Sequence, residues 1–340
     1  MNQNPYPPYN PAPPKKNHTA LVVTLIIVGV IVLALIFVGA MSAFASALSG
    51  AITSNSGYKM QNTPMYPNVA VIWISGTISA ASDGSYDQNW LISTINSLIN
   101  DTSNEALCIS MNTPGGAIYQ TDEVYLTLLK YKETGRPIYV YMNELCASGG
   151  YYISCAADEI YANRNTLTGS IGVVMNQVFD VTALCEKLGI KVTTIYSGAN
   201  KTLGGNFSEF TEEQQAIMQS LCDEAYGQFV GIVSTGRKMS DNDVRALADG
   251  RVYSAAQAEK NGLIDGIKTY DEFMDYVSEK VGGENGIPFV DYYYVHEFSF
   301  RDIFNYVKTG SVGESTQLAM LKQLVSMNFS RPSYYCNVMD

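Results

Sequence analysis

The chain has 340 residues, 46% of them hydrophobic, which is enough to bury a core in one large domain or two small ones. Its formal net charge is -11, and an acidic surface repels phosphate backbones, so the composition argues against nucleic-acid binding. The six cysteines show no CxxC pair and no metal-ligand spacing. We therefore expect no metal site and no cofactor, and we expect most of the thiols to be buried and free.

The N-terminal part predicts a membrane anchor. Residues 1–18 are rich in Pro, Asn and Tyr and predict a disordered cytoplasmic tail. Residues 19–48 carry no charge and are mostly Leu, Ile, Val, Ala and Gly, and about 20 apolar residues suffice to span a bilayer. We expect one uncleaved transmembrane helix, with a cleaved signal peptide as the alternative. Lys15 and Lys16 precede the run, which predicts a cytoplasmic N-terminus, a cell-membrane location and a folded part outside the cytoplasm.

The rest of the chain predicts a linker at 49–67, a folded domain at 68–285 and a C-terminal extension at 286–340, which is either core or an oligomer contact. Apolar runs and helical spacing predict strands at 69–75, 106–111, 137–142, 159–162, 171–175 and 191–196, and helices at 90–99, 119–131, 149–156, 181–188 and 211–238. Strands and helices that alternate in this way predict an α/β layer fold with mostly parallel strands.

One serine has the setting of a nucleophile. Ser148 stands between small residues, in Ala-Ser-Gly-Gly, at the expected junction of a strand and a helix. The two histidines are poorly placed to serve it, because His18 precedes the apolar run and His296 stands alone in an aromatic stretch. Lys201, in an uncharged run, is the candidate base, since a Ser–Lys pair can run acyl transfer. A serine before two glycines is also an ordinary helix N-cap, and most lysines are simply solvated.

Three glycine turns accompany these residues. Gly115 and Gly116 follow a predicted strand, and Gly149 follows the serine, so their backbone N–H groups could bind a developing oxyanion. Ser170 lies in a third turn, Thr-Gly-Ser-Ile-Gly. Each turn taken alone most often only reverses the chain.

Taken in order, these segments resemble the SppA-type signal peptide peptidases, the S49 serine peptidases. The matching stretches are 112–116, 146–152, 168–172, 197–201, 249–254 and 262–265. The resemblance implies a ClpP/crotonase-like fold, a repeated ββα spiral, after one N-terminal transmembrane helix. It also implies that Ser148 is the nucleophile and Lys201 the general base. Ser170 would orient the lysine amine, and the backbone around Gly115, Gly116 and Gly149 would form the oxyanion hole.

The function implied is a membrane-anchored serine endopeptidase that degrades remnant signal peptides and other short apolar peptides. The resemblance further implies a homo-oligomeric ring or bowl whose active sites draw residues from neighbouring subunits. Two features depart from the family pattern: Thr113 replaces the usual serine of the first motif, and the stretch after Lys201 is unfamiliar. Two alternatives stay open. One is a catalytically inactive SppA-like scaffold of a membrane complex, and the other is a crotonase-like acyl-thioester enzyme, which needs acidic catalytic residues and a CoA pocket.

Overall fold

The computed structural model describes residues 66–80, 85–175, 177–294 and 333–335. The predicted tail at 1–18, the anchor at 19–48 and nearly all of the linker at 49–67 lie outside the described residues, as does most of the extension at 286–340. In the described ranges, no helix combines the length and the apolar composition that crossing a membrane requires.

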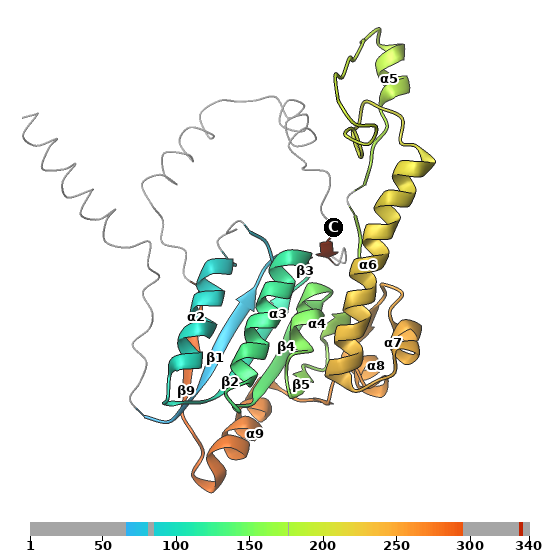
Figure 1. Cartoon of the computed structure of the whole chain (residues 1–340). Coiled ribbons are helices and arrows are strands. Elements are labelled where there is room, and N and C mark those ends of the chain that lie inside the picture. Colours follow the sequence, from blue (N-terminus) through green and yellow to red (C-terminus); the bar gives the residue numbers. More distant parts are fainter. Residues whose placement is uncertain (1–65, 81–84, 176, 295–332, 336–340) are drawn as a thin grey trace, which may run out of the picture. The chain divides into compact units, whose positions relative to one another are not determined.

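An eight-stranded, mainly parallel sheet forms the centre of the described domain (Figure 1). Its main path runs β7-β6-β4-β2-β1-β9, with β5 paired to β4 and β8 paired to β5. These strands are β1 Asn68–Ser75, β2 Asn104–Thr113, β4 Ile138–Ala147, β5 Glu159–Ala162, β6 Leu167–Gly169, β7 Val252–Ser254, β8 Gly266–Ile267 and β9 Phe289–Tyr292. Only the β6–β7 pair of this sheet is antiparallel. The predicted α/β class, the mostly parallel sheet and the strands at 69–75, 106–111, 137–142 and 159–162 are therefore confirmed.

Helices connect the strands and cover the sheet. They are α2 Gln88–Asn100, α3 Ile118–Lys132, α4 Gly149–Ser154, α5 Thr182–Lys187, α6 Glu212–Arg237, α7 Asp241–Leu247, α8 Ala255–Lys260, α9 Tyr270–Gly282 and the 3-10 turn η1 Gly283–Asn285. Side chains close several of their first turns: the Asp87 carboxylate accepts the Trp90 N–H at 2.8 Å, and Thr211 accepts the Gln214 N–H at 3.2 Å. The predicted helices at 90–99, 119–131, 149–156, 181–188 and 211–238 are confirmed as α2 to α6.

Both faces of the sheet are buried, because alternate residues of one strand pack into different cores. Ala70 and Ile72 of β1 belong to the larger core, with apolar side chains of α2, α3, α4 and α6. Val69 and Val71 of the same strand belong to a second core, with Phe273 of α9. A strand covered on both faces has a continuous apolar sequence, which is why these strands could be recognised.

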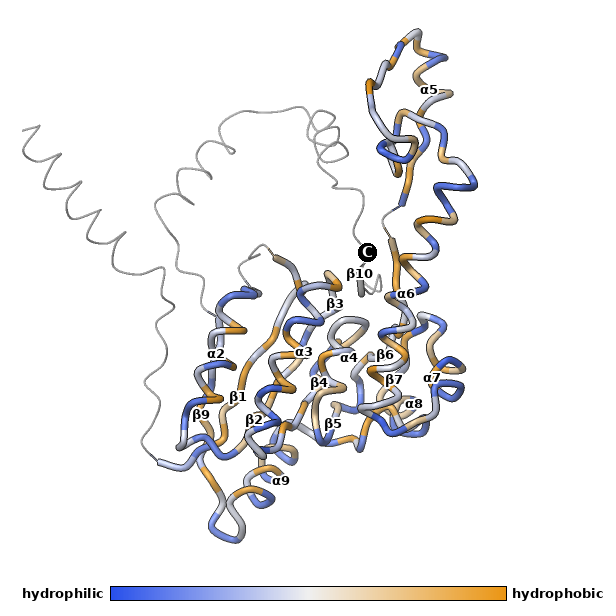
Figure 2. Tube along the Cα trace, in the orientation of Figure 1, coloured by the Kyte–Doolittle hydropathy of each residue, from blue (hydrophilic) through white to orange (hydrophobic). Residues whose placement is uncertain are grey.

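The segment between the sheet and α6 differs most from the prediction. We call residues 177–211 the arm. The predicted strands at 171–175 and 191–196 are wrong, because the described residues there form no strand and α5 is the one helix of the arm. Val174 forms an isolated bridge, but no continuous ladder is formed by the described residues of these two stretches, and a strand requires such a ladder for its backbone groups. Large apolar side chains of the arm are exposed: Phe179, Leu184, Leu188, Ile190, Val192, Ile195, Tyr196 and Phe207. Figure 2 shows that hydrophobic and hydrophilic positions are mixed along the trace of the arm.

Candidate active site

Ser148 lies at a sharp turn between a central strand and a short helix. β4 ends at Ala147, and Ser148 is the residue before α4. Its backbone has φ 55 and ψ -117, and only Ser170 and Lys238 share a positive φ among the described non-glycine residues. Such a conformation is strained, and the surrounding hydrogen bonds enforce it. The Ser148 N–H donates to the Gly169 carbonyl at 2.7 Å, and the Tyr152 N–H donates to the Ser148 carbonyl at 2.9 Å.

The predicted glycines surround this turn. A side-chain carbon on Gly149 would lie 3.2 Å from the Gly116 nitrogen and 3.3 Å from the Gly115 Cα, so these backbones are in contact. The same carbon would lie 2.7 Å from the Thr121 hydroxyl oxygen, which belongs to the first turns of α3. The structure thus brings Gly115, Gly116 and Gly149 together beside Ser148, and the position of Gly149 leaves no room for a side chain.

Gly115 and Gly116 belong to β3, Gly115–Ala117, which lies against a second backbone segment. Ile78 donates its N–H to the Gly115 carbonyl at 2.9 Å and accepts the Ala117 N–H at 2.8 Å. A side-chain carbon on Gly116 would lie 1.9 Å from the Ile78 carbonyl oxygen, so only glycine permits this approach. The Gly115 N–H donates to the Thr113 hydroxyl at 3.1 Å, which leaves Gly116 and Gly149 as the candidate oxyanion donors.

An extended segment of the chain runs along β3. The strand β10, Ser333–Tyr335, pairs with β3 in antiparallel register, with Tyr334 opposite Gly116. β3 is therefore an edge that accepts a peptide backbone directly beside the serine turn. Addition of a strand to such an edge is one of the common modes of peptide recognition.

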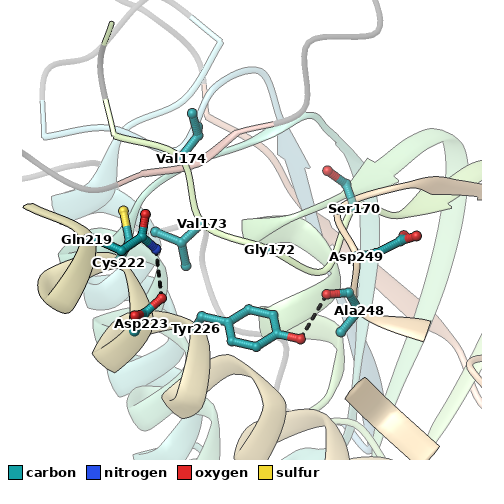
Figure 3. A pocket seen from close by; sticks show the side chains of 11 residues that line it. Ser170, Gly172, Val173, Val174, Gln219, Cys222, Asp223, Tyr226, Ala248 and Asp249 are labelled. Carbon is teal, nitrogen blue, oxygen red and sulfur yellow. Dashed lines mark hydrogen bonds between the residues drawn. The ribbon is translucent and has the colours of Figure 1, made fainter. Parts of the chain in front are cut away.

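A backbone hydrogen bond ties the segment that contains Ser170 to the Ser148 turn. Ser170 follows β6, whose last residue, Gly169, accepts the Ser148 N–H. Its side chain is buried, at 8% exposure, and lines a cavity of about 350 Å³ together with Val173, Cys222 and Tyr226. Figure 3 shows the Ser170 hydroxyl and the Cys222 thiol on opposite sides of this cavity. In the described part of the chain, no side chain bonds to the hydroxyl of Ser148 or of Ser170.

Lys201 is placed apart from these residues. It lies in the arm, its side chain is exposed, and its N–H donates to the Gly198 carbonyl at 3.1 Å. No hydrogen bond or ion pair joins it to Ser148 or Ser170 within the described residues. A single chain thus brings the predicted nucleophile, glycines and Ser170 together, but it does not bring the predicted base to them.

The thiols near the serine are poor nucleophiles. Burial raises the pKa of the Cys146 thiol to about 12, so it stays protonated near neutral pH although it lies two residues before Ser148. Burial also raises the pKa of Cys222, with the Asp223 charge adding to the effect. The described cysteines are free, with Cys108, Cys146 and Cys155 buried, as expected for most of them. In the described ranges, no group of three or more His, Cys, Asp or Glu side chains could bind a metal ion.

Sequence reasoning missed two features of the site. Thr121 contacts the Gly149 position, and a polar cluster joins α3, α4 and α6 behind the serine turn. In that cluster the Tyr152 hydroxyl donates to Asp122 at 2.5 Å, and the Gln228 amide donates to the Tyr152 oxygen at 2.8 Å. The tyrosine was visible in the Ser-Gly-Gly-Tyr-Tyr stretch, but nothing in the sequence identified its partners on other helices.

Comparison with known proteins agrees with this geometry. Residues 130–283, which include Ser148, the glycine after it and Lys201, match the family described as Peptidase family S49. The chain carries a peptidase family S49 domain. The predicted resemblance is therefore confirmed. One similar solved structure is a ClpP1 mutant from Listeria monocytogenes, which is 14% identical to this chain over 59% of this chain and 93% of that chain, with a TM-score of 0.41. The repeated ββα spiral stays a prediction.

Several curated relatives are similar to this chain. A putative signal peptide peptidase SppA from Enterococcus faecium is 35% identical over 210 residues, which cover 62% of this chain and 61% of that protein. Protease 4 of Haemophilus influenzae is 32% identical over 63% of this chain and 35% of its own length. The chloroplastic serine protease SPPA of Arabidopsis thaliana is 33% identical over 52% and 26%. The chain spans 61% to 63% of the length of the first relatives that it matches.

Proposed function

We propose that the S49 chain is a serine endopeptidase in which Ser148 attacks a peptide carbonyl and Lys201 is the general base. One observation carries the proposal: a serine with a strained backbone stands at a strand–helix turn, and the residue after it, Gly149, packs against the backbone of Gly115 and Gly116. Strained backbone at such a turn is typical of nucleophiles that must project from a rigid sheet. An ordinary N-cap role is disfavoured, because the Ser148 side chain makes no capping hydrogen bond to α4.

The chemistry follows from these positions. The Ser148 hydroxyl oxygen bonds to the carbonyl carbon while its proton passes to the neutral Lys201 amine. The N–H groups of Gly116 and Gly149 stabilise the oxyanion that forms. The carbon–nitrogen bond then breaks, and the lysine ammonium gives its proton to the leaving amine. Water attacks the resulting ester, its proton passes to the lysine, and that proton returns to Ser148 as the acid leaves.

The substrate is best described as an extended peptide. β10 supports this reading, because it shows that a backbone can pair antiparallel with β3 beside the serine. We propose remnant signal peptides and other short apolar peptides as substrates, with residues 19–48 anchoring the enzyme in the bilayer where such peptides lie. Its N-terminus would be cytoplasmic and its catalytic domain extracytoplasmic.

The base is proposed to come from a neighbouring copy. Lys201 lies in the arm, whose large apolar side chains are exposed in the described part of the chain, and Ser170 lines a cavity next to the Ser148 turn. An arm that packs on a second copy would bury this apolar surface and bring the Lys201 side chain to the cavity beside Ser170 of that copy. A repeated head-to-tail contact of this kind closes into a ring or bowl.

Mixing two inactive variants tests this arrangement. Ser148→Ala lacks the nucleophile and Lys201→Ala lacks the base, so each alone should have no turnover of a fluorogenic apolar peptide. If the dyad forms between copies, equimolar co-assembly restores wild-type serine–lysine pairs at roughly a quarter of the interfaces. Recovery of about that fraction of wild-type turnover supports the proposal. No recovery in proven mixed oligomers contradicts the shared site.

Direct labelling tests the nucleophile itself. A fluorophosphonate should modify Ser148 in the wild-type chain, and mass mapping should find the adduct on the peptide that contains it. Ser148→Ala should abolish both the label and peptide cleavage while the oligomer and its Tm stay unchanged. An alanine variant that keeps more than a few per cent of turnover would refute the assignment.

A further inference from the structure

Thr121 has a buried hydroxyl that the proposed chemistry has not used. It lies on α3 with 0% exposure, and its oxygen has no hydrogen-bond partner among the described residues. A threonine in a helix ordinarily satisfies its hydroxyl on the carbonyl four residues earlier. Thr127 on the same helix does so, because its hydroxyl donates to the Glu123 carbonyl at 2.7 Å. The difference is therefore specific to the position of Thr121.

The hydroxyl of Thr121 lies against Gly149, one of the two proposed oxyanion donors. Its oxygen lies 2.7 Å from the point that a Gly149 side-chain carbon would occupy, and the Gly116 nitrogen lies 3.2 Å from the same point. The nearest atom of Thr121 to this point is the oxygen and not the methyl group. A buried polar atom without a hydrogen-bond partner thus lies beside Gly149, where the backbone of Gly116 also approaches.

Such a group is unfavourable in the free protein. A buried hydroxyl that has lost water and found no acceptor costs folding free energy, and valine would fill the same volume without that cost. Polar groups that remain unsatisfied in a folded chain call for an explanation, and a partner that arrives with the substrate is one.

We propose that Thr121 belongs to the oxyanion site of Ser148, and that its hydroxyl gains its hydrogen-bond acceptor when a tetrahedral acyl adduct forms on Ser148. The inference rests on the proposed function. The adduct places a charged oxygen beside Gly116 and Gly149, and the Thr121 hydroxyl can then donate a hydrogen bond to this oxygen. Preorganised polar groups near a developing charge favour the transition state over the free enzyme.

Four side chains at this position separate hydrogen bonding from packing. Threonine and serine have the hydroxyl, whereas valine and alanine lack it. Threonine and valine fill the site, whereas serine and alanine leave a cavity. We expect kcat to follow the hydroxyl: Thr121→Ser stays close to wild type, and Thr121→Val and Thr121→Ala fall by about 10-fold or more. We expect stability to follow volume: the urea midpoint of Thr121→Val equals or exceeds that of wild type, and Thr121→Ser and Thr121→Ala fall. We expect KM to change little in the three variants.

The rise in Tm on binding of a peptide boronate is a measurement that should not change if Thr121 only fills space. The boronate forms a tetrahedral adduct on the serine, so it should raise Tm more in the threonine and serine proteins than in the valine and alanine proteins. Wild-type kcat in Thr121→Val, or equal boronate shifts in all four proteins, would overturn the inference while leaving the peptidase proposal intact. A wild-type chain with neither turnover nor a boronate shift would overturn both.

Discussion

The Gly149→Ala variant tests how closely α4 packs on the Gly115–Gly116 turn. The added carbon would lie 2.7 Å from the Thr121 oxygen, 3.2 Å from the Gly116 nitrogen and 3.3 Å from the Gly115 Cα. Gly149 is not among the glycines with positive φ, so the cost comes from space and not from backbone conformation. Overpacking of this kind typically costs about 1–3 kcal/mol of folding free energy.

The loss of activity should be larger than the loss of stability suggests. To admit the methyl group, the serine turn must move by a few tenths of an ångström away from Gly116, which separates the two proposed oxyanion donors. Loss of one such donor costs about 100-fold to 1,000-fold in kcat. The double variant Gly149→Ala with Thr121→Ala should regain part of the stability but little activity, because the 3.2 Å and 3.3 Å contacts are to backbone atoms.

The assay compares kcat on a fluorogenic peptide with the urea midpoint of the same preparation. Gly227→Ala on α6 is the matched control, because a carbon there meets nothing within 4 Å. Its stability should rise by up to about 1 kcal/mol through helix propensity, with kcat unchanged. If Gly149→Ala keeps more than about a tenth of wild-type kcat despite the expected fall in stability, Gly149 does not belong to the oxyanion hole.

Three further outcomes are expected. Gly116→Ala should destabilise more than Gly149→Ala, because its new carbon would lie 1.9 Å from a backbone carbonyl oxygen, and a chain of near-wild-type Tm would contradict this packing. Burial alone would raise the pKa of Asp265, but hydrogen bonds from Arg237 and a backbone N–H hold it below its usual value. The pair therefore stabilises the fold near neutral pH and less as pH falls through that lowered pKa, so Asp265→Asn should cost about 1–3 kcal/mol at pH 7 and less in acid, by urea titration. Cys222 should react with a maleimide in the native protein, faster as pH rises, whereas Cys146 should react only after unfolding.

Much of the fold could be predicted because its strands are buried on both faces. The run from Val69 to Ile74 is apolar throughout, and such a run has few alternatives to a central parallel strand. The serine turn was also predictable, since Ser148 between small residues after an apolar run marks a tight strand–helix junction. Local sequence specifies such features because each depends on neighbours along the chain.

The arm and Thr121 could not be predicted for the opposite reason. The stretch around Val192 and Ile195 has the composition of a strand, but composition does not say whether a neighbouring strand exists to pair with it. Thr121 shows no pattern in the sequence, because its role depends on α4 crossing α3 at Gly149, which is a contact distant in sequence. The separation of Lys201 from Ser148 is likewise a property of the tertiary fold, which motif order does not reveal.

A site divided between copies, as proposed for Ser148 and Lys201, would have a kinetic consequence for the cell. When the reacting groups of a hydrolase are divided between copies, its activity rises more steeply than its concentration. For an active pair of chains at high dilution, activity rises with the square of the chain concentration. The first chains made would then be inactive, and cleavage would begin only above a threshold concentration of chains. Such a threshold protects neighbouring proteins from a protease that is still being made, without a propeptide or a separate inhibitor.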